Sequence, residues 1–194
     1  MPMSRSTPDP TALKALAHPV RLRLLGLLRA EGPSTASRLA ERLGLNSGAT
    51  SYHLRSLAQH GFIVDDAERG DGRDRWWRAA HQSTWTADDP SPQSRDAQDA
   101  FSQAVAVVQT ELLQRALEDR PLLAEKWWRT TTLSDWELQL TSEDGMELKE
   151  RLVALFEEFE AREPGPGEPT DGTAPLVYQI HAFPRPGTIA GDPA

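Results

Sequence analysis

Two short amphipathic helices joined by a tight turn, within residues 34–60, constrain the fold of this chain more than any other feature. In the first helix, Leu39 and Leu43 have the spacing of one buried stripe. Gly44 stands where a helix needs a residue that tolerates positive φ in order to end. Asn46 can cap the following helix by accepting hydrogen bonds from its free backbone N–H groups. The pattern predicts a helix-turn-helix.

The second of these helices has a face suited to reading DNA. Its spacing buries Thr50, Leu54, Leu57 and Ala58 and turns Ser47, Ser51, Tyr52 and Arg55 outward. A helix that enters the major groove needs an outward face that is small and polar near its start, because bulky or acidic side chains could not approach the base edges. The candidate DNA-binding residues of this helix are therefore Ser47, Thr50, Ser51, Tyr52 and Arg55, although Thr50 also belongs to the predicted buried stripe.

The flanking segments extend the helix-turn-helix to a winged helix-turn-helix. Upstream, a short helix is predicted to end near Ala17, and a second helix follows the break at His18 and Pro19. Downstream, residues 62–64 and 75–78 read as two strands of a ribbon whose tip contains Gly70 and Gly72. On this ribbon, Arg73 and Arg75 are candidates for contacts with phosphate or with the minor groove.

Over about residues 11 to 80 the chain resembles the ArsR-like family of bacterial winged-helix transcription regulators. The resemblance is carried by the segments LKALAHPVRLRLLGLL, STASRLAERLGL and ATSYHLRSLAQHGFI. It implies a cytoplasmic regulator of transcription that binds a double-stranded DNA operator as a homodimer, with repression the more common outcome. Less than half of the chain is covered, and the second half has no comparably strong motif.

The charge of the chain is distributed unevenly. The net charge is −8, which by itself is unusual for a protein that binds nucleic acid. Residues 1–80 contain 12 Lys and Arg against 8 Asp and Glu, whereas the remainder contains 9 against 21. The predicted DNA-binding domain is therefore positively charged, and the acidic half repels phosphate and limits non-specific binding.

Several other classes of protein are excluded or disfavoured. The absence of cysteine excludes disulfides and thiolate metal sites. No apolar run has the length of a membrane span, and the first ten residues lack the apolar core of a signal peptide, so we expect no membrane association. A phosphate-binding glycine loop and a nucleophile elbow are also missing, so we expect no enzymatic activity and no cofactor.

The second half is expected to add a long helix and a small module. The predicted fold is mainly α with a small β component. A winged helix-turn-helix domain at residues 1–80 is followed by a linker at 81–95 and a dimerisation helix at 96–120. A small α+β module of strand, helix and strand is predicted at residues 121–183, and a disordered tail at 184–194. The long helix has a near-heptad apolar stripe formed by Phe101, Val105, Val108, Leu112 and Leu117. This stripe favours pairing with a second copy, and the alternative is packing on the first helix of the same chain.

Metal and effector sites receive little support from the sequence. Relatives that sense metals use Cys pairs whose positions correspond here to Thr35 and Ser37, neither of which suits a soft metal. His53 and His60 could meet on one helix, but two ligands make a poor site. Trp127, Trp128 and Trp136 could line a pocket for a small-molecule effector, or else fill the core of the C-terminal module.

Two other functions remain open on the sequence alone. The winged helix could serve protein contacts without a specific DNA site, although the outward Arg55 and the basic ribbon oppose this. It could also anchor a DNA-processing enzyme, but no catalytic constellation supports that reading. The sequence does not reveal the operator, the regulated genes, the sign of regulation or the effector.

Overall fold

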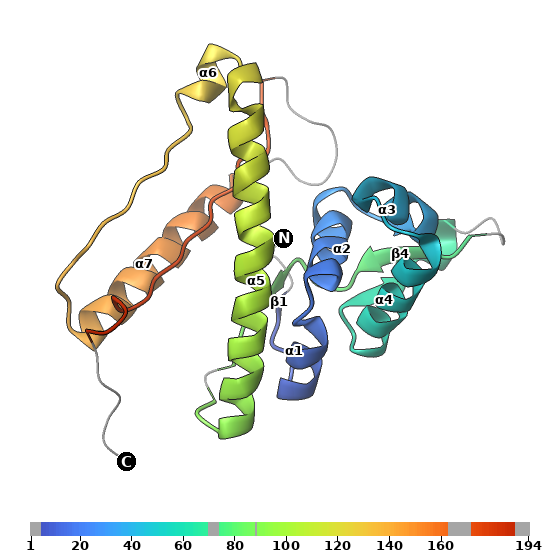
Figure 1. Ribbon diagram of the computed structural model, residues 1–194, viewed down its shortest axis with the longest axis horizontal. Helices are drawn as coiled ribbons and strands as arrows, with labels where there is room; N and C mark the ends of the chain where they lie inside the picture. Colours follow the sequence, from blue (N-terminus) through green and yellow to red (C-terminus); the bar gives the residue numbers. More distant parts are fainter. Residues whose placement is uncertain (1–4, 70–73, 88, 163–171, 189–194) are drawn as a thin grey trace. The chain divides into compact units, whose positions relative to one another are not determined.

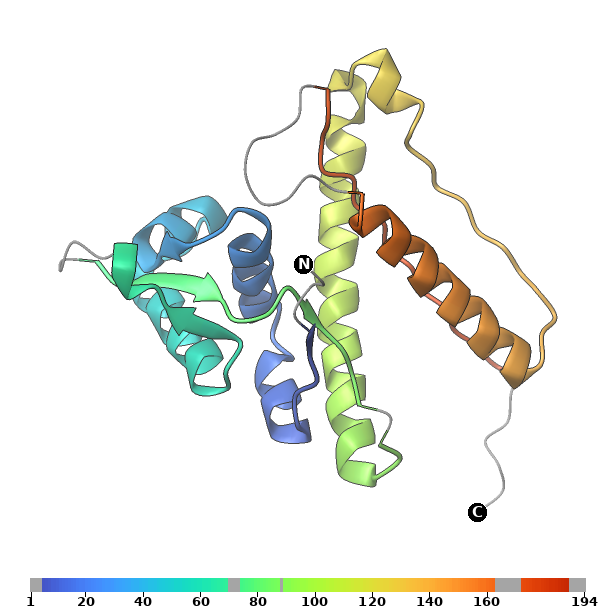
Figure 2. The same ribbon diagram turned by 180° about the vertical axis from the view of Figure 1, so that it is seen from behind.

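The computed structural model describes residues 5–69, 74–87, 89–162 and 172–188. Its contacts divide the chain into two units, Met1–Thr131 and Thr132–Ala194. The first unit begins with four helices, α1 (Pro10–Leu16), α2 (Pro19–Ala30), α3 (Ala36–Leu43) and α4 (Ser47–Gln59). In Figure 1 and Figure 2, α1 and α2 lie between the long helix α5 (Pro92–Asp119) and the pair α3 and α4.

Each helix of the helix-turn-helix begins and ends where its sequence signals predict. Thr35 caps α3 by accepting from the backbone N–H of Arg38, and Gly44 ends that helix with a φ of 65°. Asn46 caps α4 through its Oδ1, which accepts from the N–H of Ala49 at 2.7 Å. Because these capping groups satisfy backbone groups that would otherwise lack partners, they fix the short turn between α3 and α4.

The wing is a three-stranded antiparallel sheet with the order β2–β4–β3. Its strands are β2 (Ser34–Thr35), β3 (Ile63–Asp65) and β4 (Trp76–Ala79), and the short 3-10 helix η1 (Ala67–Arg69) follows β3. The mainly helical winged helix-turn-helix that the sequence predicts is confirmed. The glycine-bearing tip at residues 70–73 lies outside the described residues.

One apolar core holds the winged helix together. It is formed by buried residues of the first four helices and the sheet: Ala12, Leu16, Leu24, Leu25, Leu28, Leu39, Leu54, Leu57, Phe62, Ile63 and Trp77. Full burial of a leucine or isoleucine side chain contributes about 1.5–3 kcal/mol. The orientation of α4 therefore depends mainly on Leu54 and Leu57, which are almost completely buried.

A second, two-stranded sheet joins the beginning of the chain to the segment after the wing. The strand β1 (Arg5–Ser6) pairs in parallel with β5 (Ser83–Thr84). Arg29, at the end of α2, donates to the carbonyl oxygen of His81 and to Oγ1 of Thr84, both at 2.8 Å. Burial lowers the pKa of Arg29 to about 10, so the side chain stays charged at neutral pH. The predicted linker at residues 81–95 therefore contains an anchored strand.

The long helix α5 starts earlier than the sequence suggests and has two different halves. It begins at Pro92, inside the predicted linker, where Ser91 caps it. Its first half packs on α1 and α2 through Ala97 and Ala104, and Phe101 contacts the core. Its second half exposes Val107, Leu112, Leu113 and Leu117. Of the apolar stripe, Phe101, Val105 and Val108 are half-buried, whereas Leu112 and Leu117 are exposed. The helix is followed by η2 (Arg120–Leu122) and α6 (Glu125–Trp128).

The second unit contains the predicted helix without the predicted strands. Helix α7 (Ser142–Glu160) begins with a capping box in which Thr141 and Asp144 satisfy each other's backbone N–H groups. Among the described residues after Thr84 there is no strand, so the strands of the predicted module, expected within residues 127–140 and 176–184, are wrong. Residues 125–128 form α6 instead, and the remaining residues of both segments have no regular structure.

Most apolar side chains of the second unit are exposed. Trp136 is 81% exposed, and on α7 both Leu155 and Phe159 are exposed as well. The internal contacts include the rings of Phe156 and Tyr178, whose centroids are 5.5 Å apart. The predicted module therefore has no buried core among its described residues, because no paired strands cover the helix. Most of the predicted loop around residues 163–171 and the end of the predicted tail lie outside the described residues.

Candidate nucleic-acid interface

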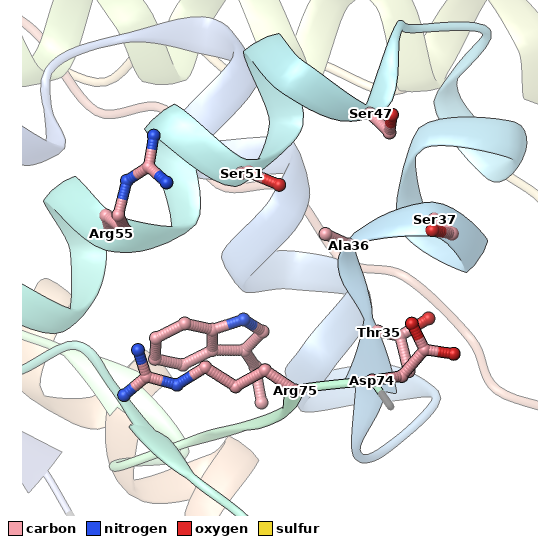
Figure 3. Close-up of a pocket in the computed structure, with 9 residues that line it drawn as sticks. Thr35, Ala36, Ser37, Ser47, Ser51, Arg55, Asp74 and Arg75 are labelled. Atoms are coloured by element: carbon pink, nitrogen blue, oxygen red, sulfur yellow. The ribbon is translucent and has the colours of Figure 1, made fainter. Parts of the chain in front are cut away.

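The outward face of α4 is built from the residues that the sequence selects. Ser47, Tyr52 and Arg55 are exposed, and Ser51 is half-buried. Tyr52 is 60% exposed, which is unusual for a large aromatic side chain inside a folded domain. Figure 3 shows Ser47, Ser51 and Arg55 along one side of this helix. The face has no acidic residue, so a phosphodiester backbone could approach it without electrostatic repulsion.

Thr50 does not belong to this face. Its side chain is completely buried, and its hydroxyl donates to the backbone oxygen of Asn46 at 3.0 Å. The periodicity that buries Leu54 and Leu57 turns Thr50 toward the same core. We therefore correct the list of candidates and treat Thr50 as a core residue.

A shallow hollow of about 330 Å³ separates α4 from the wing. Its lining comes from the start of α3, one side of α4 and the beginning of β4: Thr35, Ala36, Ser37, Ser47, Ser51, Arg55, Asp74, Arg75 and Trp77. Figure 3 shows Arg55 and Arg75 on opposite sides of this hollow. Two guanidinium groups and several hydroxyls suit an anionic, hydrogen-bonding surface such as a nucleic-acid backbone.

Arg75 is already engaged in two contacts. Its Nε donates to Oδ2 of Asp65 at 2.6 Å, and its guanidinium lies 4.1 Å from the centroid of the Trp77 ring. Its side chain remains 59% exposed, so a phosphate could still reach it. Any such contact would compete with the carboxylate of Asp65. The other candidate on the wing, Arg73, lies outside the described residues.

Comparisons with known proteins agree with this geometry. A family model described as a helix-turn-helix domain matches residues 16–65. The HTH-type transcriptional regulator NmtR of Mycobacterium tuberculosis is 43% identical over 56 residues, which are 29% of this chain and 46% of that protein. The HTH-type transcriptional regulator YgaV of Escherichia coli is 39% identical over 59 residues, which are 29% of this chain and 60% of that protein. Residues 16–65 therefore match a helix-turn-helix domain, and part of the chain is similar to these two transcriptional regulators.

The family model covers residues 16–65 of the chain. The chain spans about half the length of the curated relatives it matches. A solved structure of a mutant of Lactococcus lactis ZitR in its apo form is 20% identical, with a TM-score of 0.30 over 73% of this chain and 81% of that chain. The matched segment ends at the last residue of β3, so the strand β4 lies beyond it.

Two residues beside the helix-turn-helix domain's outward face were missed by the sequence reasoning. Arg38, exposed on α3, places its guanidinium 4.8 Å from the centroid of the Trp76 ring. Asp74 lines the hollow directly before Arg75. The contact of Arg38 depends on the register in which Thr35 faces Trp76 across β2 and β4. No local pattern reveals that register, because β2 has only two residues.

The histidines of the helix-turn-helix domain pair differently from the expectation. The ring of His53 lies 4.7 Å from that of His18, between centroids, whereas Nδ1 of His60 contacts the backbone oxygen of Ser56 at 2.9 Å. Thr35 uses its hydroxyl as a helix cap. Among the described residues, no group of three or more His, Asp or Glu side chains could hold a metal ion. Within the same residues, no helix is long and apolar enough to cross a membrane.

Proposed function

We propose that the protein is a sequence-specific DNA-binding regulator of bacterial transcription, acting in the cytoplasm on a double-stranded operator. The observation that carries this proposal is the exposed, acid-free face of α4 with Ser47, Tyr52 and Arg55 beside a hollow that contains a second arginine. Such a face can enter the major groove, where arginine pairs with the O6 and N7 atoms of guanine. Ser51 borders the hollow and would complete the contacts with bases.

The proposed regulator acts as a homodimer. The second half of α5 supports this step, because Leu112, Leu113 and Leu117 are exposed on a helix whose first half is fixed to the winged helix. Exposed apolar patches on a helix usually mark an interface. Two copies joined in this way would present two α4 helices to two half-sites of one operator.

We further propose that the regulator represses transcription by occupying a promoter, without catalysis and without the metal sites of its relatives. Thr35 and Ser37 stand at the positions where metal-sensing relatives have cysteines, and their hydroxyls are poor ligands for soft metals. Trp128, in the first unit, and Trp136, in the second, are both exposed, so they give no support to a small-molecule effector.

Selection of genomic fragments by the purified protein tests the proposal directly. Fragments that bind would be sequenced, and the shared site would be footprinted with and without the variant Arg55→Ala. The proposal requires enrichment of a site with two similar halves and a protected region over it. A reporter placed behind that site would give the sign of regulation. Equal recovery of all fragments at every salt concentration would contradict sequence-specific binding.

A second function has one observation in its favour. The exposed apolar side chains of α7, including Leu155 and Phe159, favour contacts with another protein. The winged helix would then be a protein-interaction module without a specific DNA site. Under that reading Arg55→Ala would leave the recovery of DNA fragments unchanged, so the same selection experiment separates the two functions.

A further inference from the structure

A cluster of one arginine and two histidines lies beside α4, across its buried stripe from Ser51. His18 and Arg21 come from the start of α2, and His53 comes from α4. The rings of His18 and His53 are 4.7 Å apart, and the ring of Tyr52 lies 5.3 Å from that of His53. Helical periodicity places His53 across the buried stripe from Ser51, with Tyr52 between them on the outward face.

We propose that Arg21, His18 and His53 form a second phosphate-binding site, which contacts the DNA backbone opposite the wing and takes up a proton as it does so. The inference rests on the proposed function, since it assumes that α4 enters the major groove. That groove is about 12 Å wide and is bordered by a phosphate strand on each side. Arg75 lines the hollow on one side of α4. Because the cluster is on the other side of this helix, we expect the second phosphate strand to pass beside it.

In the part of the chain that the structure describes, the charged groups that lower the pKa of His53 are His18 and Arg21, and neither is a carboxylate. The helices and the strand packed against α4 carry further charged residues that do not appear among these influences: Lys14 of α1, Arg23 and Arg29 of α2, Arg38, Glu41 and Arg42 of α3, and Asp65 of β3. The flank of α4 at His53 is therefore electropositive and suits a phosphate group.

Two nitrogen atoms in this cluster lack partners among the described residues. These are Nε of Arg21 and Nδ1 of His53, and both are covered by protein. Buried polar atoms usually have hydrogen-bond partners, so these two nitrogen atoms are exceptions that need an explanation. Both side chains remain partly exposed, and a phosphate would meet the outer nitrogens of Arg21 and Nε2 of His53.

The two histidines have different parts in the proposed site. Val20 donates its backbone N–H to Nδ1 of His18 at 3.2 Å, so this nitrogen must be unprotonated while it caps α2. Nε2 of the neutral His18 ring then carries the proton and can donate to a phosphate oxygen. His53 has no such constraint, which makes it the group that takes up the additional proton.

The electrostatic surroundings give the direction of the pH effect. Burial lowers the pKa of His53, and the nearby His18 and Arg21 lower it further, so the ring is neutral in the free protein at pH 7. A phosphate beside the ring favours the charged form and raises its pKa. Binding is then coupled to protonation, and the affinity should increase as the pH falls.

The test measures proton uptake and affinity with a mixed-sequence DNA duplex, since a phosphate contact needs no operator. Calorimetry of the wild type in two buffers of different ionisation enthalpy should show proton uptake on binding. Between about pH 8 and pH 6 the affinity should rise several-fold, with a limit of about tenfold per pH unit for one proton. His53→Gln should remove this dependence, whereas His60→Gln, at the C-cap of the same helix, should retain it.

Arg21→Gln tests the same site through salt. It should weaken binding at every pH and reduce the slope of log affinity against log salt by about one unit, while Arg21→Lys restores most of the slope. Thermal melts of the free variants check that each is folded. The inference is overturned if the wild type binds duplex without proton uptake, or if Arg21→Gln leaves the salt slope unchanged. A wild type that binds no duplex at low salt would instead overturn the proposed function itself.

Discussion

Arg75, which directly precedes β4, donates from Nε to Oδ2 of Asp65, the last residue of β3, at 2.6 Å. The same guanidinium rests on the ring of Trp77, at 4.1 Å from its centroid. A phosphate that approaches Arg75 would compete with this carboxylate for the guanidinium. We therefore expect Asp65 to limit the non-specific affinity for DNA.

Asp65→Asn should therefore strengthen binding to a mixed-sequence duplex. The change removes a negative charge next to the DNA and frees Arg75, so the slope of log affinity against log salt should become steeper by about one unit. Fluorescence anisotropy over a salt series gives both quantities. The matched control is Glu31→Gln, which releases Arg42 from a similar exposed ion pair between α3 and the end of α2. If Asp65→Asn and Glu31→Gln change the affinity and the salt slope equally, Asp65 does not limit DNA binding through its contact with Arg75.

Arg55→Ala should reduce affinity for the operator by about 1–3 kcal/mol and relax the preference at one base position. The reason is that Arg55 is exposed on α4 and borders the hollow, within reach of base edges. Competition between the operator and single-base variants measures both effects. Arg95→Ala serves as the control because Arg95 is exposed near the start of α5. If Arg55→Ala weakens binding to all duplexes equally, the residue contacts the backbone instead.

The helix-turn-helix could be predicted because its signals are local. Gly44 and Asn46 lie within three residues of the helix ends that they define, and the apolar spacing of Leu54 and Leu57 fixes which face of α4 is buried. The exposed recognition face follows from the same spacing. These features need no knowledge of any distant residue.

Other features could not be predicted because they depend on pairing between distant segments. The contact between Arg75 and Asp65 follows from the register of β3 and β4, and the contact between His18 and His53 follows from the packing of α2 on α4. The alternation of Trp136 and its neighbours favoured a strand, but alternation makes a strand only where another strand pairs with it. In the described residues no such partner is present after β5.

Thr50 and Ser51 should respond differently although they are neighbours. Thr50→Val removes a buried hydroxyl that donates to Asn46, and it should cost about 0.5–1.5 kcal/mol of folding free energy without changing base preference. Ser51→Ala should leave stability nearly unchanged and alter DNA binding. Urea unfolding and operator competition separate the two effects. If Thr50→Val changes the base preference and leaves the folding free energy unchanged, Thr50 contacts DNA after all.

Metal ions should leave DNA affinity unchanged. The expectation follows from the hydroxyl side chains of Thr35 and Ser37, which are poor ligands for soft metals, and from the engagement of Thr35 as the cap of α3. Anisotropy with zinc, nickel, copper or arsenite, each followed by a chelator, measures the response. A change in DNA affinity that the chelator reverses would contradict the expectation. His18 and His53 would then be the first candidate ligands, because their rings are close enough to bind one metal ion.

The double variant Leu112→Glu and Leu117→Glu should convert a dimer into monomers and weaken operator binding. Both side chains are exposed on the second half of α5, and opposing copies would bring four carboxylates into one apolar interface. The winged helix should stay folded, because its core involves only the first half of this helix, at Phe101. Sedimentation velocity gives the oligomeric state, and circular dichroism confirms the fold.

The control for that experiment adds the same charges where no interface is expected. Gln103→Glu and Gln114→Glu introduce two carboxylates at exposed polar positions of the same helix. These changes should preserve the dimer, because they replace polar side chains of similar size and remove no apolar contact. Monomers in the control would mean that charge on α5 is sufficient to separate the copies. A folded dimer in the leucine variant would show that the pairing surface lies elsewhere, and α7 with its exposed Leu155 would be examined next.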